Sequence, residues 1–161
     1  MVTTMRPKSH VIVKDIPVAH INLDGIDWKQ KAVAAEPTGK GDLLCIDGWF
    51  GRMFRSCREC VEDELDEYVR MYNEMCARLD EDPAHEYYEV LSWNDLYYLH
   101  GLMPSIAGDE WGYTNTDDYR VDMDFRIEYI DHGEYYELFG EPYIVYYPYD
   151  WCTPDACYKE V

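Results

Sequence analysis

Six cysteines are the first residues in this chain whose type and spacing could do chemistry. Cys57 and Cys60 form a CxxC motif, and Cys152 and Cys157 form a second close pair. Four thiolates could hold zinc tetrahedrally, but the pairs are far apart in the sequence and the second has four intervening residues. The alternative is that Cys57, Cys60 and Cys76 belong to the apolar face of a helix, because free cysteine behaves as a small buried hydrophobe. We favour this alternative and expect no metal site and no cofactor.

The even number of cysteines also allows disulfides. The first eight residues carry charges with no apolar segment behind them, so they do not resemble a secretion signal. A chain of 161 residues with 47% hydrophobic content can build a core without cross-links. We therefore expect reduced cysteines in a cytoplasmic protein. No segment approaches the roughly 18 uninterrupted apolar residues of a membrane span, and an anionic membrane would repel this chain.

Paired carboxylates are the next candidates for chemistry. Asp122 and Asp124 would share one face of a strand, a spacing that could bind Mg²⁺ for hydrolysis. Such pairs arise by chance among 33 acids, and the five histidines share no metal-ligand spacing. The sequence contains no P-loop, GxGxxG, GxSxG or HExxH motif. We therefore expect no catalytic residues and no enzyme, with a metal-dependent hydrolase kept as a third hypothesis.

Two helices are predicted to position these residues. Apolar residues at spacings of three and four over residues 56–80 predict one long amphipathic helix, which begins at a capping box of Ser56 and Glu59. A short helix is expected over residues 93–100, where Ser92 is a good N-cap.

The other elements are predicted to be strands. Strict alternation over residues 119–129 predicts one strand, and 143–147 is its antiparallel return across a turn at 131–134. Shorter strands are expected at 10–14, 18–23 and 43–46. The predicted fold is α+β: a twisted antiparallel sheet packed with one long amphipathic helix and one short helix. We expect residues 1–161 to form a single domain. A subdivision into a neutral strand and loop part (1–55) and an acidic helix and hairpin part (56–161) is the alternative.

Charge is distributed unevenly along the chain. Residues 1–60 hold nine Lys and Arg against seven Asp and Glu, whereas residues 61–161 hold five against twenty-six. The net charge is −19. All sixteen tyrosines lie in the acidic part, which is not typical of an acidic disordered tail. The sequence therefore indicates a folded domain with a dense negative surface, which suits a basic partner built to hold nucleic acid.

The spacing of the acids allows them to imitate a nucleic-acid backbone. Acids one helical turn apart are about 5.4 Å apart and alternate strand residues about 6.8 Å, a scale similar to that of successive phosphates. The alternative is a generically acidic surface, but residues 61–90 hold eleven acids against Arg70 and Arg78 alone. The residues expected to bind the partner are Glu62, Asp63, Glu64, Asp66, Glu67, Glu74, Asp80, Glu81, Asp82, Asp117, Asp118, Asp122, Asp124 and Glu128.

The tyrosines have two interpretations. Tyr68, Tyr72, Tyr119 and Tyr129 fall on predicted inward faces and should belong to the core. Adjacent tyrosines should not all be buried, because neighbours on a strand point in opposite directions. The adjacent pairs are 87–88, 97–98, 135–136 and 146–147. Exposed tyrosines beside carboxylates suit protein contacts better than base stacking, so we expect no direct binding of nucleic acid.

One stretch of the chain resembles small acidic accessory proteins of phages and integrative elements of gut Firmicutes. The resemblance lies in the segment LSWNDLYYLHGL (91–102) and in GDEWGY (108–113), followed by an acidic hairpin between 121 and 147. It covers about residues 90–148, and Trp111-Gly112 is inverted relative to the "GW" of those proteins. The resemblance implies a setting in which anti-CRISPR inhibitors occur, several of which act as DNA mimics. We therefore expect an anti-CRISPR-like inhibitor of a basic CRISPR effector of the Cas9 type.

A second hypothesis is a non-inhibitory interaction module of a mobile element that uses its exposed aromatics. The nearly neutral residues 1–60 could supply a homodimer face or a second contact, and the sequence does not choose between them.

Overall fold

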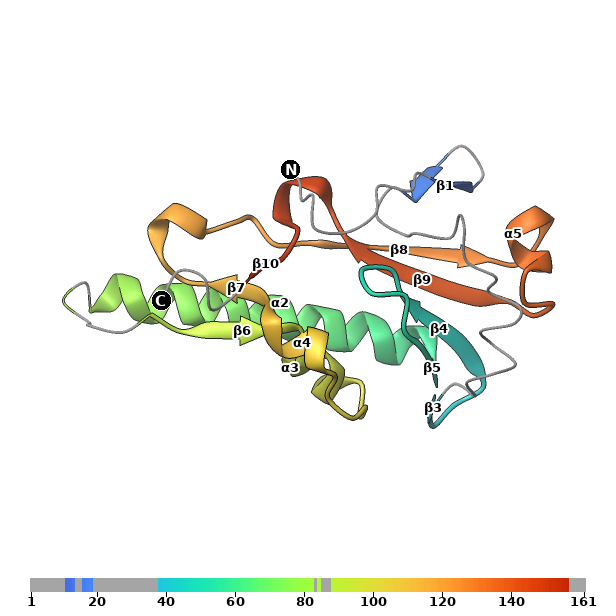
Figure 1. Cartoon of the computed structure of the whole chain (residues 1–161), viewed down its shortest axis with the longest axis horizontal. Coiled ribbons are helices and arrows are strands. Elements are labelled where there is room, and N and C mark those ends of the chain that lie inside the picture. Colours follow the sequence, from blue (N-terminus) through green and yellow to red (C-terminus); the bar gives the residue numbers. More distant parts are fainter. Residues whose placement is uncertain (1–10, 14–15, 19–37, 83, 85–87, 157–161) are drawn as a thin grey trace.

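The computed structural model has a mixed α+β fold (Figure 1). It describes residues 11–13, 16–18, 38–82, 84 and 88–156. The strands are β1 (Val11–Val13), β2 (Ile16–Val18), β3 (Thr38–Gly39), β4 (Leu43–Asp47), β5 (Met53–Ser56), β6 (Val90–Ser92), β7 (Trp111–Thr114), β8 (Phe125–Ile130), β9 (Tyr143–Pro148) and β10 (Asp155–Ala156). The helices are α2 (Arg58–Glu81), α3 (Trp93–Leu99), α4 (Ile106–Glu110) and α5 (Gly133–Glu137), with 3-10 turns η1 (Asp117–Tyr119) and η2 (Asp150–Cys152).

The largest sheet has five strands in the order β3-β5-β4-β9-β8. Its β4–β5 and β8–β9 pairs are antiparallel, but β4–β9 and β3–β5 are parallel. The prediction of an antiparallel sheet is therefore wrong for this sheet, which is mixed. The reason is topological: the chain passes through α2 before it returns as β9 beside β4, and a long connection of this kind allows parallel pairing. A second sheet, β10-β7-β6, is antiparallel, as is the pair of β1 and β2.

The predicted acidic hairpin is present, but its first strand is shorter than expected. Strand β8 begins at Phe125 rather than at residue 119, because its last partner on β9 is Pro148, which has no N–H to extend the ladder. The segment before β8 instead contains the turn η1. The return strand is confirmed as β9, and the predicted turn at 131–134 contains the start of α5.

The long helix is confirmed as α2. It buries Val61, Leu65, Tyr68, Tyr72 and Met75 at helical spacing. Figure 1 shows that it runs past both larger sheets along most of the length of the molecule.

The predicted N-cap of this helix is off by one residue. Ser56 ends β5 and is buried, so the adjacent Cys57 becomes the N-cap, and the predicted capping box with Glu59 does not form.

The short helix is confirmed as α3. Ser92 and Asp95 form the predicted capping box, with the Ser92 side chain accepting from the Asp95 N–H and the Asp95 carboxylate accepting from the Ser92 N–H. Gly101 follows the helix with φ +77°, the left-handed conformation that glycine adopts without strain. Residues 91–113 therefore fold as a capped helix that leads, through α4, into β7.

Two hydrophobic clusters lie on opposite faces of the five-stranded sheet. The larger joins α2 and α3 to the sheet and includes Tyr146, whereas the smaller includes Tyr147 beside α5. Both tyrosines are buried, because both faces of this sheet are covered. The prediction that the adjacent tyrosines are not all buried is confirmed by Tyr97 and Tyr98, which are 1% and 80% exposed. Tyr68 and Tyr72 are core residues as predicted. Tyr119 and Tyr129 are exposed instead. Tyr119 lies in the turn η1 and not on a strand, so the predicted alternation does not place it on an inward face.

The shorter predicted strands are present in part. Strand β4 confirms the prediction for 43–46 and ends at the turn predicted at Asp47. The predicted strand at 10–14 corresponds to β1. Of the predicted strand at 18–23, only residue 18 belongs to β2, and 19–23 lie outside the described residues.

The cysteines differ from the expectation of a fully reduced chain. Cys57 and Cys60 form a disulfide, whereas Cys45, Cys76 and Cys152 are free. Cys57 and Cys60 are also exposed, so their assignment to the buried face of the helix is wrong. Cys157, the last member of the zinc alternative, lies outside the described residues, among which no group of three His, Cys, Asp or Glu side chains could hold a metal ion.

Candidate functional site: an acidic groove between helix and sheet

A groove of about 320 Å³ lies between α2 and β8, where the two predicted acidic segments meet. The residues that line it are Glu62, Asp63, Leu65, Asp66, Val69, Asp124, Phe125 and Ile127. Four of these are carboxylates from the predicted partner-binding set. The structure thus brings together residues that are about 60 positions apart in the sequence.

The floor of the groove is apolar and its rim is acidic. Leu65 belongs to the core, and Val69, Phe125 and Ile127 pack against it while remaining partly exposed. This layout follows from the sequence, because the apolar stripe of a helix and the alternate residues of a strand both turn towards the core. A lysine or arginine side chain matches such a groove, since its aliphatic stem can lie on the floor while its charge meets the rim.

Three rim carboxylates carry uncompensated charge. Within the described part of the chain, Asp63, Asp66 and Asp124 form no ion pair, and all three are exposed. Glu62 differs, because its carboxylate accepts from Arg58 Nε at 3.3 Å. The groove therefore has a net negative rim that a basic partner could neutralise.

Farther along α2, the helix neutralises part of its own charge. Arg70 forms ion pairs with Glu67 and Glu74, at i,i+3 and i,i+4 spacing. The hydrogen bond from Arg70 holds the pKa of Glu67 below its usual range. These two glutamates remain partly or fully exposed, but they present less net charge than the groove rim.

The other predicted acids do not form one continuous surface with the groove. Arg120 lies beyond the far end of β7 and forms ion pairs with Asp80 and Asp117. Asp118 lines a separate cavity of about 220 Å³ next to β7 and β10. Asp122 is exposed just before β8. Glu81 and Asp82 are exposed at the C-terminal end of α2.

Two predicted acids have internal partners. The Glu128 carboxylate accepts from Arg126 Nε at 2.7 Å, and only 14% of the Glu128 side chain is exposed. Glu64 turns towards His100, with 2.7 Å between Glu64 Oε1 and His100 Nδ1. These two residues are less suited to bind a partner than the sequence indicated.

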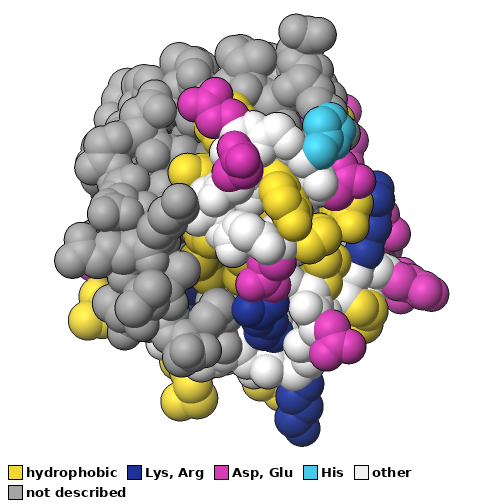
Figure 2. Space-filling model, turned by 90° about the vertical axis from the view of Figure 1, so that its right-hand side faces the viewer, with side chains coloured by type: hydrophobic (Ala, Val, Ile, Leu, Met, Phe, Trp, Pro, Cys, Tyr) yellow, Lys and Arg dark blue, Asp and Glu magenta, His cyan; other side chains and the backbone are white. Residues whose placement is uncertain are grey.

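Acidic and hydrophobic side chains also lie together outside the groove. Figure 2 views the end of the molecule that carries α5 and shows Asp and Glu side chains around a patch of hydrophobic ones. This arrangement resembles that of protein-contact surfaces, which combine apolar area with charged groups at the edge.

A buried polar cluster surrounds Asp47 and was not predicted from the sequence. This carboxylate is fully buried and accepts hydrogen bonds from Trp93 Nε1 at 2.9 Å and from the Tyr97 hydroxyl at 2.5 Å. The backbone N–H groups of Trp49 and Phe50 also donate to it. Burial raises the pKa of Asp47 above 3.8, while these hydrogen bonds act to lower it. The Asp-Gly turn signal at the end of β4 marks the position but not its partners.

A second buried network connects α2, α3 and β9 through His100. The side chain of His100 is 0% exposed and stacks on Phe54, with ring centroids 4.6 Å apart. Its Nε2 lies 2.8 Å from the Tyr146 hydroxyl. Burial holds the pKa of Tyr146 well above its usual value, so this hydroxyl stays protonated and can donate to Nε2, while Nδ1 donates to Glu64.

We expect His100→Ala to lower the free energy of unfolding by about 2–4 kcal/mol, because it removes a stacked ring and leaves the buried Tyr146 hydroxyl and the partly exposed Glu64 carboxylate without their partner. Urea denaturation would measure the change. His132→Ala is the matched control, since His132 is exposed and contacts only its neighbour Asp131 among the described partners. It should change stability by less than about 0.5 kcal/mol. Equal effects of the two substitutions would show that the buried network does not stabilise the fold.

Comparisons with known proteins found no protein similar to this chain. No family model matches the chain. No curated protein and no solved structure matches it either. None of the helices in the described residues is long and apolar enough to cross a membrane.

Proposed function

We propose that this protein is an acidic inhibitor that binds the basic, nucleic-acid-binding surface of a defence nuclease in the cytoplasm of a bacterial host cell. The partner we favour is a CRISPR effector of the Cas9 type, against which the protein would act as an anti-CRISPR and DNA mimic. Such an effector holds its guide–target duplex in a positively charged channel, so an acidic protein can compete for the same side chains. Binding requires no cofactor, no direct contact with nucleic acid and no membrane.

The observation that carries this proposal is the groove between α2 and β8. Its rim holds Asp63, Asp66 and Asp124, which form no ion pair with any residue that the structure describes, and its apolar floor can accept the stems of lysine and arginine side chains. A net charge of −19 adds long-range attraction to any basic surface and raises the rate of association. The resemblance of residues 90–148 to mobile-element proteins supports the same class of partner.

We expect inhibition to depend strongly on salt. Exposed charges more than about 8 Å apart are largely screened at physiological ionic strength, so the affinity for the effector should fall steeply between low and moderate salt. The experiment is a titration of the purified protein into a Cas9–guide complex with target DNA at both salt concentrations. DNA binding and DNA cleavage are measured in parallel.

Each result of this titration has a definite meaning. Loss of DNA binding supports a mimic that occupies the DNA channel. Loss of cleavage with DNA still bound supports an inhibitor that acts away from that channel. An interaction that does not change with salt would contradict the electrostatic mechanism, and no effect at either salt concentration would exclude this effector as the partner.

A second candidate function is supported by a different surface. Tyr98, Met103 and Ile106 are 80%, 76% and 85% exposed around α3 and α4. Exposed large hydrophobic side chains close in sequence are typical of protein-contact sites. The chain would then be an interaction module that binds another protein, or a second copy of itself as a homodimer, through these side chains rather than through charge.

A further inference from the structure

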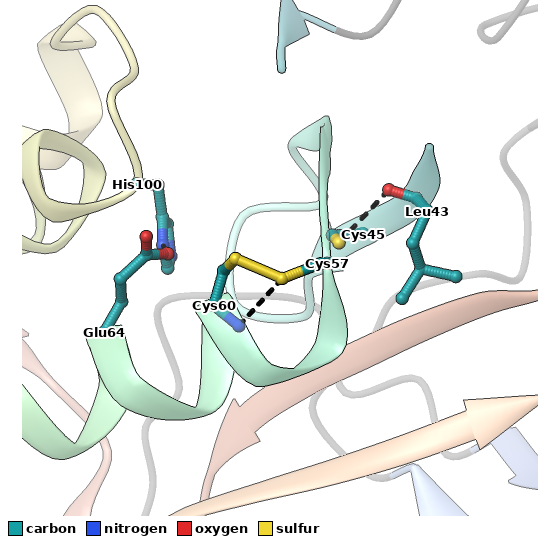
Figure 3. Close-up of a disulfide and its surroundings, with 6 residues drawn as sticks. All are labelled: Leu43, Cys45, Cys57, Cys60, Glu64 and His100. Carbon is teal, nitrogen blue, oxygen red and sulfur yellow. Dashed lines mark hydrogen bonds and ion pairs between the residues drawn. A yellow bond between two sulfur atoms is a disulfide. The ribbon is translucent and has the colours of Figure 1, made fainter. Parts of the chain in front are cut away.

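The Cys57–Cys60 disulfide lies outside the acidic groove and has no part in the proposed function. It is at the start of α2, directly after β5, in the order strand, CxxC, helix. Figure 3 shows the disulfide in the first turn of α2, with Cys45 on the neighbouring strand β4. Glu64 lies about one turn farther along α2 and faces His100, which follows α3. Both half-cystines are exposed, so small molecules can reach the sulfur atoms.

This disulfide is poorly placed to stabilise the fold. It joins residues three positions apart that the helix already holds in one turn, with their Cα atoms 5.2 Å apart. A cross-link stabilises chiefly by restricting the unfolded chain, and the restriction grows with the length of the closed loop. A loop this short restricts little. The structural need for the bond is therefore small, while its exposure favours exchange.

The helix terminus favours a thiolate at Cys57. Cys57 is the N-cap of a 24-residue helix, and its Sγ accepts from the Cys60 N–H at 3.1 Å. The N-terminal end of a helix stabilises negative charge, and thiols at such positions ionise more readily. Arg58 adds a nearby positive charge, although it pairs with Glu62 and lies over the Tyr129 ring.

Other neighbouring charges act in the opposite direction. Glu59 lies in the same turn, and Glu64 lies one turn on, paired with His100 of α3. The CxxC geometry and the helix terminus act directly on the sulfur atom, whereas Glu64 is paired with His100 and Glu59 is exposed, so that solvent screens its charge.

We propose that Cys57 and Cys60 form a redox-active pair that exchanges with low-molecular-weight thiols, with Cys57 as the exchanging residue. A thiolate RS⁻ attacks Cys57 Sγ, the Cys57–Cys60 bond breaks, and Cys60 leaves as a thiolate that takes up a proton. A second thiolate attacks the R sulfur of the mixed disulfide, which forms RSSR and releases the Cys57 thiolate at the helix terminus. Two electrons pass from two thiols to the pair, and each step is reversible.

The test is equilibration of the native chain in buffers of reduced and oxidised dithiothreitol, and separately of reduced and oxidised glutathione. The reactions are quenched in acid, the free thiols are alkylated, and intact mass gives the number of labels. We expect two labels to be gained together at one midpoint, with the same midpoint from the oxidised and the reduced side. The double variant C57S/C60S reports the background from the other cysteines, and serine at position 57 keeps a good N-cap.

Single variants identify the exchanging residue. In C60S, Cys57 should form a mixed disulfide with oxidised glutathione at least about threefold faster than Cys60 does in C57S, because the helix terminus raises the thiolate fraction of Cys57 and its lower intrinsic nucleophilicity offsets that gain only in part. The proposal is overturned if the pair is reduced only after the protein is denatured, or if Cys60 reacts as fast as Cys57. Neither result would affect the inhibitor proposal, which is tested by nuclease activity.

Discussion

Replacing Asp47 with alanine is expected to lower the free energy of unfolding by about 3–5 kcal/mol, which approaches the whole stability of a domain of this size. The substitution leaves the Trp93 indole N–H and the Tyr97 hydroxyl without their acceptor in the core, together with two backbone N–H groups of the turn after β4. These donors surround a fully buried position, since Asp47 is 0% exposed. Chemical denaturation followed by tryptophan fluorescence would measure the loss, since Trp93 reports directly on this cluster.

The matched control is Asp42→Ala. Asp42 precedes the same strand but is exposed, and its described hydrogen bond to Arg55 uses only the backbone carbonyl. We expect a change of less than about 0.5 kcal/mol. If Asp47→Ala were no more destabilising than Asp42→Ala, the buried cluster would not be a determinant of the fold.

The pH dependence of stability provides an independent check on the same residue. Burial raises the pKa of Asp47 in the folded protein above its ordinary value of 3.8, so the folded state binds more protons than the unfolded state just above that value. The contribution of Asp47 should therefore make the wild type less stable as pH rises through this window. Asp47→Asn has no group to titrate there, so the difference between the two proteins should shrink as pH rises. A difference that grows with pH would contradict the raised pKa.

The sequence predicted the local elements better than their arrangement. The helical stripe of α2, the capping box of Ser92 and Asp95, and the β8–β9 hairpin all depend on residues close in the chain. The parallel pairing of β4 with β9 joins residues about 100 positions apart, and no local pattern specifies it. The start of β8 was missed for the same reason, because it depends on the partner Pro148 rather than on the alternation that continues before it.

The candidate site was predicted in its residue types but not in its geometry. Asp63, Asp66 and Asp124 were expected to be surface acids, and the structure places them on one groove. Glu64 was expected to be like them, yet it turns to His100, since a helical position next to the apolar stripe can face either solvent or a neighbouring element. A buried partner such as Asp47 also leaves little local signal, because a short Asp-Gly sequence is typical of an exposed turn.

Charge reversal at the groove is expected to weaken binding to the effector by roughly 30- to 1,000-fold at low salt. In the double variant Asp63→Lys with Asp66→Lys, two attractions are lost and two repulsions replace them, at about 1 kcal/mol each for charges near 4 Å in water. Both side chains are exposed and form no described ion pair, so the fold should be retained. Affinity would be measured by titration of the variant into the Cas9–guide complex, with thermal unfolding as a check on folding.

Two further variants separate the mechanism from its alternatives. Glu134→Lys with Glu137→Lys makes the same change in net charge on the exposed positions of α5, and we expect it to weaken binding only about threefold or less, through long-range attraction alone. If it weakened binding as much as the groove variant, total charge rather than the groove would determine recognition.

Tyr98→Ala removes the exposed ring of α3 and should leave inhibition unchanged. A larger loss from Tyr98→Ala than from the groove variant would favour association through aromatic side chains, because a contact that survives the reversal of two charges cannot depend on imitating the charge of nucleic acid.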